Sequence, residues 1–256
     1  MKKTYFIDLD GTMYMGTKVI DGAIEFIDYL LANDIPFLFL TNNASRTRVQ
    51  AQQHMLKMGF KGILPEHFYT SAMAASDYIR LCYPDAKRVN FIGQDGLDEA
   101  LRDNGFELDF KQPEFFFVGL DRTATYQDYS FGVQMLVNGA RLVGTNNDRL
   151  LVTESGFGVG NGSVVALFEH ASNQESIKVG KPHRPIIDGA LKFAKVSANE
   201  VILVGDNLET DILTGIKASI ETIFVTTGVH TMEDCHTLNI QPTYIVANLY
   251  DYMRSF

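Results

Sequence analysis

Two aspartates separated by one residue directly follow the first apolar run of the chain. The run is residues 4–7, and Asp8 and Asp10 come next, with Gly11 after them. Side chains at i and i+2 of an extended backbone point the same way, so both carboxylates would crowd the end of a buried strand. Like charges that close are costly unless a cation or a proton lies between them, and oxygen ligands suit a hard cation such as Mg²⁺. Taken alone, the segment also fits an Asx-turn, since Asp and Gly are common where strands end.

A second acidic group follows a later apolar run, residues 201–204. Asp206 comes shortly after that run, where it could bind a metal, and Asp211 falls in the first turn of the helix predicted next. A carboxylate in that turn could orient a metal-bound water. The alternative to a metal site is a simple helix start. Asn207 or Thr210 could cap this helix, and acidic side chains are favoured at its positive end.

Groups suited to an anion occur at two further places. Thr41, Asn42 and Asn43 end the apolar run 36–40, where a hydroxyl, amides and backbone N–H groups can hold an anion together. Lys181 lies between a glycine and a proline and could give a compact positive charge to a phosphate. Each feature alone is common, because Thr and Asn often cap helices and a single Lys usually lies at the surface. Together with the acids they predict a site that processes phosphate.

The elements that must position these residues alternate along the chain. Strands are predicted over 4–7, 36–40, 201–204, 222–225 and 244–246, and helices over 23–33, 45–58 (with Ser45 as its cap) and 210–218. This alternation predicts βαβ units with right-handed crossovers and a parallel sheet. Ligand sites in such sheets form at the carboxyl ends of the strands, so we expect the motifs to meet there.

The middle of the chain has a similar but more broken pattern. Strands are expected over 89–92, 115–118 and 142–143, and a helix over 126–138. We interpret this block as a second α/β unit inserted into the first. The predicted domains are therefore 1–77 with 179–256, and 78–178 as the insertion.

Composition excludes several classes of protein. The chain has 256 residues, 46% of them hydrophobic, and a formal net charge of -9. An acidic surface repels nucleic acid, so nucleic acid is an unfavourable partner. The sequence contains no stretch of ~18 apolar residues, so we expect no membrane span. Cys82 and Cys235 are too far apart for a metal motif and are expected as thiols in a reducing cytoplasm. The glycine-rich residues 156–162 do not fit a dinucleotide or P-loop motif and are expected to form a loop.

The four motifs, in this order, resemble those of the haloacid dehalogenase-like superfamily of phosphatases. The finer pattern is similar to its NagD-type subfamily, which also includes p-nitrophenyl phosphatases. The stretches that carry this similarity are residues 40–43 with 45–47, 69–74, 144–146 and 205–211. The resemblance implies a doubly wound, Rossmann-like core with a parallel sheet and a large α/β cap inserted between the second and third motifs.

The resemblance also implies roles for individual residues. Asp8 would attack phosphorus and Asp10 would act as general acid and then general base. Mg²⁺ would be held by Asp8, the carbonyl of Asp10 and Asp206, with Asp211 acting directly or through water. Charge on the phosphate would be shared by Lys181, Thr41 and Asn42. The residues expected to contact substrate are Asn42, Asn43, Asn146, Asp148 and Arg149.

The predicted function is hydrolysis of small phosphomonoesters such as nucleoside monophosphates, sugar phosphates or p-nitrophenyl phosphate. A phosphotransferase or mutase using the same phosphorylated aspartate is one alternative, and a non-catalytic protein that binds phosphorylated ligands is another. Relatives often dimerise through the cap, so a homodimer formed through the cap is a further possibility.

Overall fold

The computed structural model describes residues 2–153 and 156–254, with only the backbone described at 152 and 153. Contacts between residues divide the chain into two compact units. Unit 1 comprises Met1–Thr41, Arg48–Tyr69 and Ala190–Phe256, and unit 2 comprises Asn42–Thr47 and Thr70–Gly189. These units are defined by contacts and do not test where an insertion begins and ends. The domain boundaries 1–77, 78–178 and 179–256 therefore stay a prediction.

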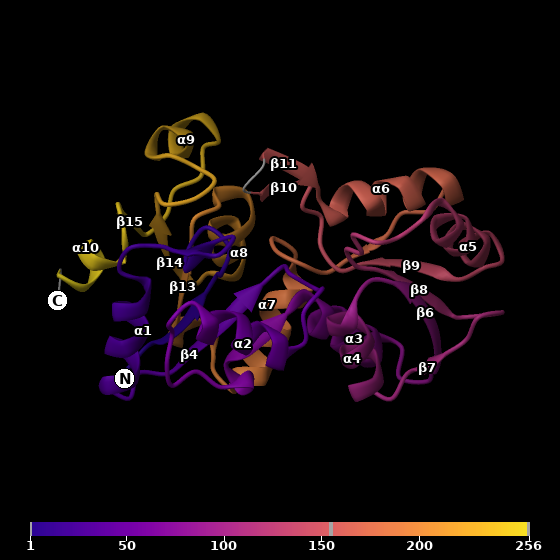
Figure 1. Cartoon of the computed structure of the whole chain (residues 1–256), viewed down its shortest axis with the longest axis horizontal. Helices are drawn as coiled ribbons and strands as arrows, with labels where there is room; N and C mark the ends of the chain where they lie inside the picture. Colours follow the sequence, from indigo (N-terminus) through magenta and orange to yellow (C-terminus); the bar gives the residue numbers. More distant parts are fainter. Residues whose placement is uncertain (1, 154–155, 255–256) are drawn as a thin grey trace. The chain divides into compact units, whose positions relative to one another are not determined.

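Unit 1 is built on a six-stranded sheet in the order β15-β14-β13-β1-β4-β5 (Figure 1). Its strands are β1 (Thr4–Ile7), β4 (Phe37–Thr41), β5 (Phe68–Thr70), β13 (Val201–Gly205), β14 (Glu221–Val225) and β15 (Tyr244–Val246). The pairs from β4 through β1, β13 and β14 to β15 are parallel, with Tyr5 opposite Phe37 on one side and Ile202 on the other. The chain extends the sheet in opposite directions from β1, which places the topological switch point between β1 and β13.

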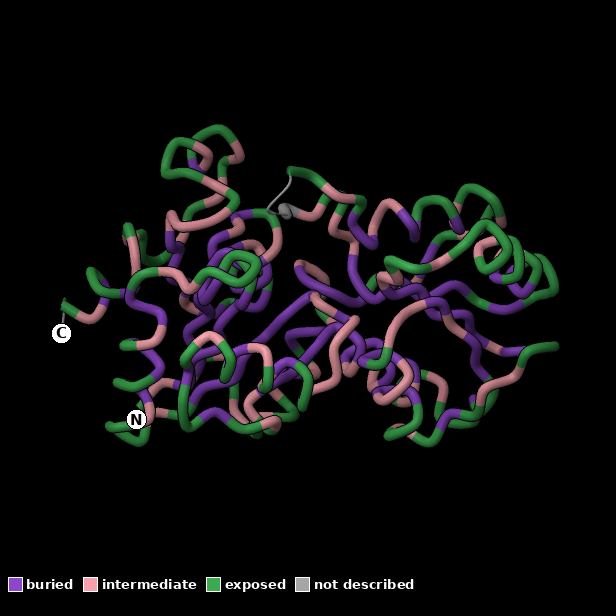
Figure 2. The backbone as a smooth tube through the Cα atoms, viewed as in Figure 1, coloured by how far each residue is buried: buried purple, intermediate pink, exposed green. Residues whose placement is uncertain are grey.

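The central strands of this sheet are buried along their whole length, and Figure 2 draws buried residues in purple. Every residue of β1, β4 and β13 is buried, which is why these strands read as continuous apolar runs instead of alternating ones. Helix α1 (Ala23–Ala32) covers the sheet with Phe26, Ile27 and Leu30. The other helices of this unit are α2 (Arg48–Lys57), η1 (Pro65–His67), η2 (Ala198–Glu200), η3 (Leu208–Ile212), α8 (Leu213–Ala218), α9 (Met232–Thr237) and α10 (Leu249–Met253).

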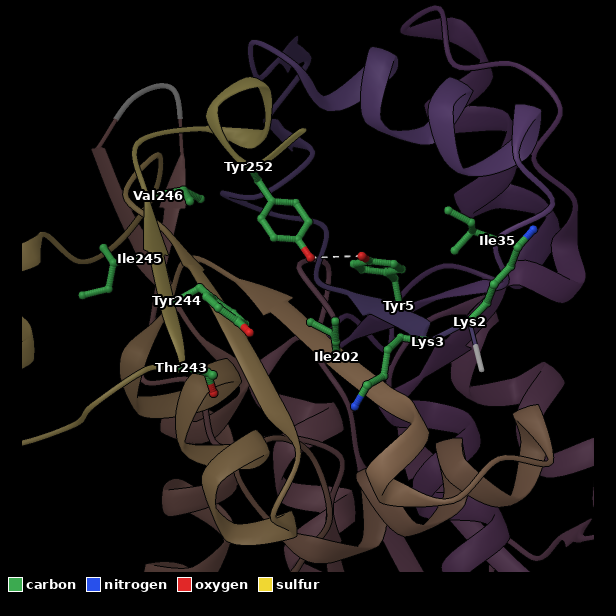
Figure 3. A pocket seen from close by; sticks show the side chains of 10 residues that line it. All are labelled: Lys2, Lys3, Tyr5, Ile35, Ile202, Thr243, Tyr244, Ile245, Val246 and Tyr252. Carbon is green, nitrogen blue, oxygen red and sulfur yellow. Dashed lines mark hydrogen bonds between the residues drawn. The ribbon is translucent and has the colours of Figure 1, made fainter. Parts of the chain in front are cut away.

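A pocket of about 780 Å³ lies beside the amino ends of β1 and β13 and along β15 (Figure 3). The hydroxyl groups of Tyr5 and Tyr252 form a hydrogen bond of 3.0 Å there. Burial raises the pKa of both phenols, so they stay neutral. The Lys3 ammonium donates to Glu221 at 2.8 Å. The Tyr5–Tyr252 pair thus joins α10 to β1 at this end, and the acidic motifs lie at the other ends of β1 and β13.

Unit 2 is a second α/β unit with a parallel sheet in the order β12-β9-β8-β6-β7. Its strands are β6 (Arg88–Ile92), β7 (Glu107–Leu108), β8 (Phe115–Val118), β9 (Arg141–Gly144) and β12 (Ile177–Lys178). Its helices are α3 (Ser71–Cys82), α4 (Asp95–Asp103), α5 (Tyr126–Val137) and α6 (Asn161–Ser172), and α7 (Arg184–Ala194) is shared between the units. The two parallel sheets with flanking helices confirm the predicted α/β fold class.

Three local predictions from the sequence were wrong. The helix expected from Ser45 begins at Arg48, and the Ser45 hydroxyl donates instead to the carbonyl of Leu120. The helix expected over 210–218 begins earlier, as the π-helix η3, before α8 continues it. The glycine-rich residues 156–162, expected as a loop, contribute strand β11 (Gly156–Val159), which pairs antiparallel with β10 (Leu150–Thr153). The Ser45 hydroxyl bond and the β10–β11 pairing are both contacts with residues that the local pattern does not include.

Two short strands that the sequence pattern did not predict, β2 (Tyr14–Met15) and β3 (Lys18–Val19), form a hairpin after the first motif. In the part of the chain that the structure describes, no helix combines the length and the apolar character needed to cross a membrane.

Candidate active site

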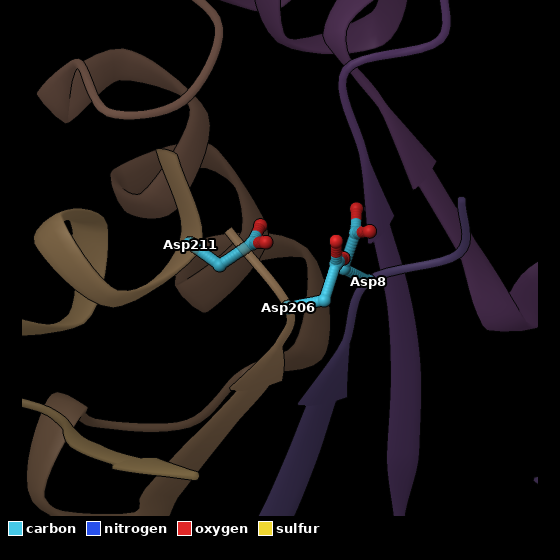
Figure 4. A group of neighbouring side chains, drawn as sticks. All are labelled: Asp8, Asp206 and Asp211. Carbon is cyan, nitrogen blue, oxygen red and sulfur yellow. The ribbon is translucent and has the colours of Figure 1, made fainter. Parts of the chain in front are cut away.

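Three buried carboxylates meet at the carboxyl ends of β1 and β13. Asp8 follows β1, Asp206 follows β13, and Asp211 lies on η3. One oxygen from each lies within 4.8 Å of the others, and the residues are 7%, 1% and 1% exposed, respectively (Figure 4). Buried carboxylates this close repel one another strongly unless a cation offsets their charge. All the atoms that could bind a metal here are carboxylate oxygens, so the group fits a hard divalent cation such as Mg²⁺.

Two glycines allow the backbone to pass close to these carboxylates. Gly11 has a φ of +96°, and a Cβ there would overlap the Asp206 carboxylate. A Cβ at Gly205 would overlap the side chain of Asp211. A larger residue at either position would displace a carboxylate, so the close packing of the acids depends on glycine at both.

Hydrogen bonds fix how the two later acids are oriented. Thr12 Oγ1 donates to Asp206 Oδ1 at 3.0 Å, and the Asn207 N–H donates to Asp211 Oδ2 at 3.1 Å. The Asn207 side chain accepts from the N–H groups of Glu209 and Thr210 and so caps η3; it is one of the two caps that the sequence left open. A π-helix is rare and is often found at functional sites, and here it carries Asp211 into the acidic group.

The structure places two other predicted residues of unit 1 beside these elements. Thr41 is the last residue of β4 and is 3% exposed. Asp10 is exposed, at the turn whose Gly11 N–H donates to the Tyr14 carbonyl at 2.8 Å. Its side chain does not belong to the group formed by Asp8, Asp206 and Asp211. The two aspartates of the first motif therefore differ in environment, one buried and one open to solvent.

The side-chain amide of Asn42 holds the backbone of Lys181 at two points within unit 2. Asn42 Oδ1 accepts from the Lys181 N–H at 2.8 Å, and Asn42 Nδ2 donates to the Lys181 carbonyl at 3.2 Å. Lys181 is 2% exposed. A buried ammonium is tolerated only beside groups that offset its charge. Lys181 is therefore a buried lysine with a fixed backbone and not the ordinary surface lysine that the sequence left open.

Two of the predicted substrate contacts in unit 2 also bond to Asn42. Asn146 Nδ2 donates to the Asn42 carbonyl at 2.8 Å, and Asp148 Oδ1 accepts from Asn42 Nδ2 at 3.0 Å. Arg149 is exposed. Asn43 Oδ1 accepts from the N–H of the residue two positions on, Ser45, at 2.9 Å, as in an Asx-turn. The structure thus brings Asn42, Asn146, Asp148 and the backbone of Lys181 together.

Sequence reasoning missed several polar residues that support these groups. In unit 2 they include Ser71, whose Oγ donates to the Asn42 carbonyl at 2.6 Å, and Asn161, whose Nδ2 donates to the Asn146 carbonyl at 3.2 Å. In unit 1 they are Thr12 and the segment 226–230 that follows β14. That segment begins at the carboxyl end of a predicted strand, so the rule applied to the other motifs could have found it.

Comparison with known proteins gives matches over both ends of the chain. Residues 5–107 match the haloacid dehalogenase-like hydrolase family, and residues 178–252 match a HAD-hydrolase-like family. An acid sugar phosphatase of Staphylococcus epidermidis is 40% identical over 248 residues, which is 96% of this chain and 95% of that protein.

Two solved structures share the fold along almost the entire chain. A mutant of a thermostable p-nitrophenylphosphatase from Bacillus stearothermophilus is 41% identical, with a TM-score of 0.85 over 98% of this chain and 97% of that one. NagD from Escherichia coli K-12 is 31% identical, with a TM-score of 0.89 over 97% of each chain.

Proposed function

Because this chain belongs to the haloacid dehalogenase-like hydrolase family and resembles its NagD-type members, we propose that it hydrolyses small phosphomonoesters, sugar phosphates first among them, through a phosphorylated Asp8. The observation that carries the proposal is the buried group of Asp8, Asp206 and Asp211. Such a group could hold a divalent cation at the end of the strand from which Asp8 would reach a bound phosphate. The acid sugar phosphatase relative supports sugar phosphates as the first substrate class to test.

In the proposed reaction an oxygen of Asp8 attacks phosphorus while the bond from phosphorus to the ester oxygen breaks. Asp10 gives its proton to the departing oxygen, which leaves as an alcohol. Asp10, now a carboxylate, then takes a proton from the water that attacks the phosphorylated Asp8. Phosphate departs, and Asp8 regains its carboxylate. The exposed position of Asp10 suits proton exchange with substrate and water, and burial of Asp8 suits a nucleophile that must stay in place.

Charge neutralisation is the second requirement of this reaction. We assign Asp8, Asp206, Asp211 and the carbonyl of Asp10 as the groups that would hold Mg²⁺, which would let a carboxylate approach an anionic phosphate. Lys181, with Thr41 and Asn42, is proposed to share the phosphate charge. The support for Lys181 is its burial and its rigid backbone within unit 2.

The remaining assignments stay proposals. Asn43, Asn146, Asp148 and Arg149 are proposed to help select the substrate, with Arg149 the most exposed of them. We propose a cytoplasmic location. We also propose a homodimer formed through the inserted unit, because the family that the sequence resembles often dimerises in this way.

The proposal is tested by phosphate release with Mg²⁺ across sugar phosphates, nucleoside monophosphates and p-nitrophenyl phosphate. Replacing Asp8 by Asn should reduce turnover roughly 10⁴-fold or more, because an amide is a poor nucleophile. Asp28→Asn, at an exposed position on α1, is the matched control and should retain full activity. Full activity of Asp8→Asn would overturn the proposal. Phosphate release that drops when a sugar acceptor is added, with a new phosphate ester formed, would indicate a phosphotransferase instead.

A further inference from the structure

The segment Thr226 to His230, which we call the 226–230 loop, takes no part in the proposed reaction but contacts its acidic group at Asp206. It follows β14, the strand that pairs with β13. It bonds to three separate segments that carry functional residues: the turn after Asp10, the Asp206 carboxylate and the start of η3. No other role is evident for so many specific contacts in one short loop of unit 1.

The first contact is to the turn of the first motif. Thr227 Oγ1 donates to the Gly11 carbonyl at 2.8 Å, across 216 residues of sequence. Gly11 is in the left-handed region and lies against Asp206, so its peptide unit has little room to shift. The Thr227 hydroxyl therefore fixes the direction of the backbone that leaves Asp10.

The second contact is to a carboxylate of the acidic group itself. The Val229 N–H donates to Asp206 Oδ2 at 2.8 Å, while Thr12 Oγ1 donates to Asp206 Oδ1 at 3.0 Å. Each oxygen of Asp206 thus accepts from a different segment, which fixes the rotation of the carboxylate. A Cβ at position 228 would overlap Asp206 Oδ2, so Gly228 is required for the loop to come this close.

The third contact is to the helix that carries Asp211. His230 Nδ1 accepts from the N–H of Leu208, the first residue of η3, at 3.2 Å. An accepting Nδ1 is unprotonated. Its other ring nitrogen lies 3.8 Å from a carboxylate oxygen of Glu209. His230 therefore joins the loop to η3, and the same short segment contacts the supports of both later acids.

We propose that the 226–230 loop is a positioning element that holds Asp206 and the Asp10–Gly11 turn in the geometry that binds the divalent cation, with Thr227 and Gly228 as its positioning residues. This inference rests on the proposed function for the identity of the site. It goes beyond that function by assigning control of metal affinity to residues outside the group of Asp8, Asp206 and Asp211.

The test measures metal affinity directly, by calorimetric titration of Mg²⁺ into the protein without substrate. Thr227→Val keeps the size of the side chain but removes the hydroxyl, and should weaken Mg²⁺ binding roughly fivefold, the effect of losing one hydrogen bond. Thr227→Ser restores the hydroxyl and should restore the affinity. Thr226→Val is the matched control, since the hydrogen bond of Thr226 to Val246 uses its backbone N–H and survives the change.

Each outcome has a separate meaning. Equal Mg²⁺ affinity of Thr227→Val and the wild-type protein would overturn the inference while leaving the proposed phosphatase intact. Absence of Mg²⁺ binding by the wild-type protein would instead contradict the metal site itself. Weakened binding in Thr226→Val to the same degree as in Thr227→Val would also overturn the inference, because it would point to general loosening of the loop. Gly228→Ala gives a second reading if Thr227→Val fails to fold, and should weaken binding more than Thr227→Val does because it displaces Asp206.

Discussion

At the scale of single residues, the environment of each aspartate explains the role proposed for it. Asp8 and Asp206 are buried among carboxylates, whereas Asp10 is exposed on a turn two residues beyond Asp8. From their spacing in the sequence, the side chains of Asp8 and Asp10 were expected to point the same way. The structure separates them: Asp10 is exposed, and its carboxylate does not belong to the group of Asp8, Asp206 and Asp211.

This separation predicts a distinct behaviour for Asp10→Asn with p-nitrophenyl phosphate. The nitrophenolate leaves without needing a proton, so phosphorylation of Asp8 should proceed, while hydrolysis of the phosphorylated enzyme lacks its base and slows by roughly 10²-fold or more. Rapid mixing should show a burst of about one nitrophenolate per chain followed by slow turnover. Asp28→Asn should give no such burst. A rate in Asp10→Asn that equals wild type, with no burst, would contradict the assigned base.

At the scale of elements, strands could be predicted from sequence more readily than helix starts. The buried strands β1, β4 and β13 read directly from unbroken apolar runs, since both faces are covered. Helix starts depend on which polar side chain bonds to which backbone group. Ser45 looked like a cap, but its hydroxyl bonds to a carbonyl on a segment distant in sequence, which no local pattern reveals.

The cap of η3 should affect metal binding as well as stability. Asn207→Ala removes an acceptor for two N–H groups at the start of the helix that carries Asp211, and should cost about 1 kcal/mol of unfolding free energy. Thr125→Ala removes the equivalent cap of α5 in unit 2 and should cost a similar amount. Urea unfolding would measure both losses. Only Asn207→Ala should weaken Mg²⁺ binding in a titration, and equal affinities in the two variants would refute the link between this cap and Asp211.

The short helix η1 gives the protein a pH-dependent contact. Burial lowers the pKa of His67 below its ordinary value of about 6.5, and its Nδ1 accepts from the Leu64 N–H at 3.2 Å. The unfolded chain therefore binds more protons than the folded chain as the pH falls below about 6.5, so this contribution to stability is present above that pH and lost below it. Thermal unfolding from pH 7.5 to 5 should show the loss in wild type and a smaller one in His67→Asn, whose amide oxygen can still accept. An identical pH dependence in both proteins would count against this contact as its source.

At the scale of the whole molecule, the sequence predicted two α/β units but could not assign every residue to one of them. Asn42 adjoins Thr41 in the sequence, yet it groups with unit 2, where its amide holds the backbone of Lys181. Contacts of this kind join residues 139 positions apart. They depend on the folded arrangement of loops, whereas the two acidic motifs directly follow the apolar runs of β1 and β13, which is why those motifs were visible in the sequence and their supports were not.

The central claim is that Asp8 becomes phosphorylated during turnover, and one measurement tests it most directly. The Asp10→Asn variant is mixed with p-nitrophenyl phosphate, quenched during turnover and treated with borohydride, which reduces an acyl phosphate to an alcohol. Peptide mass spectrometry should then find homoserine at position 8, and no homoserine when substrate is left out. Turnover by this variant with an unmodified Asp8, or with the modification at another carboxylate, would contradict the account.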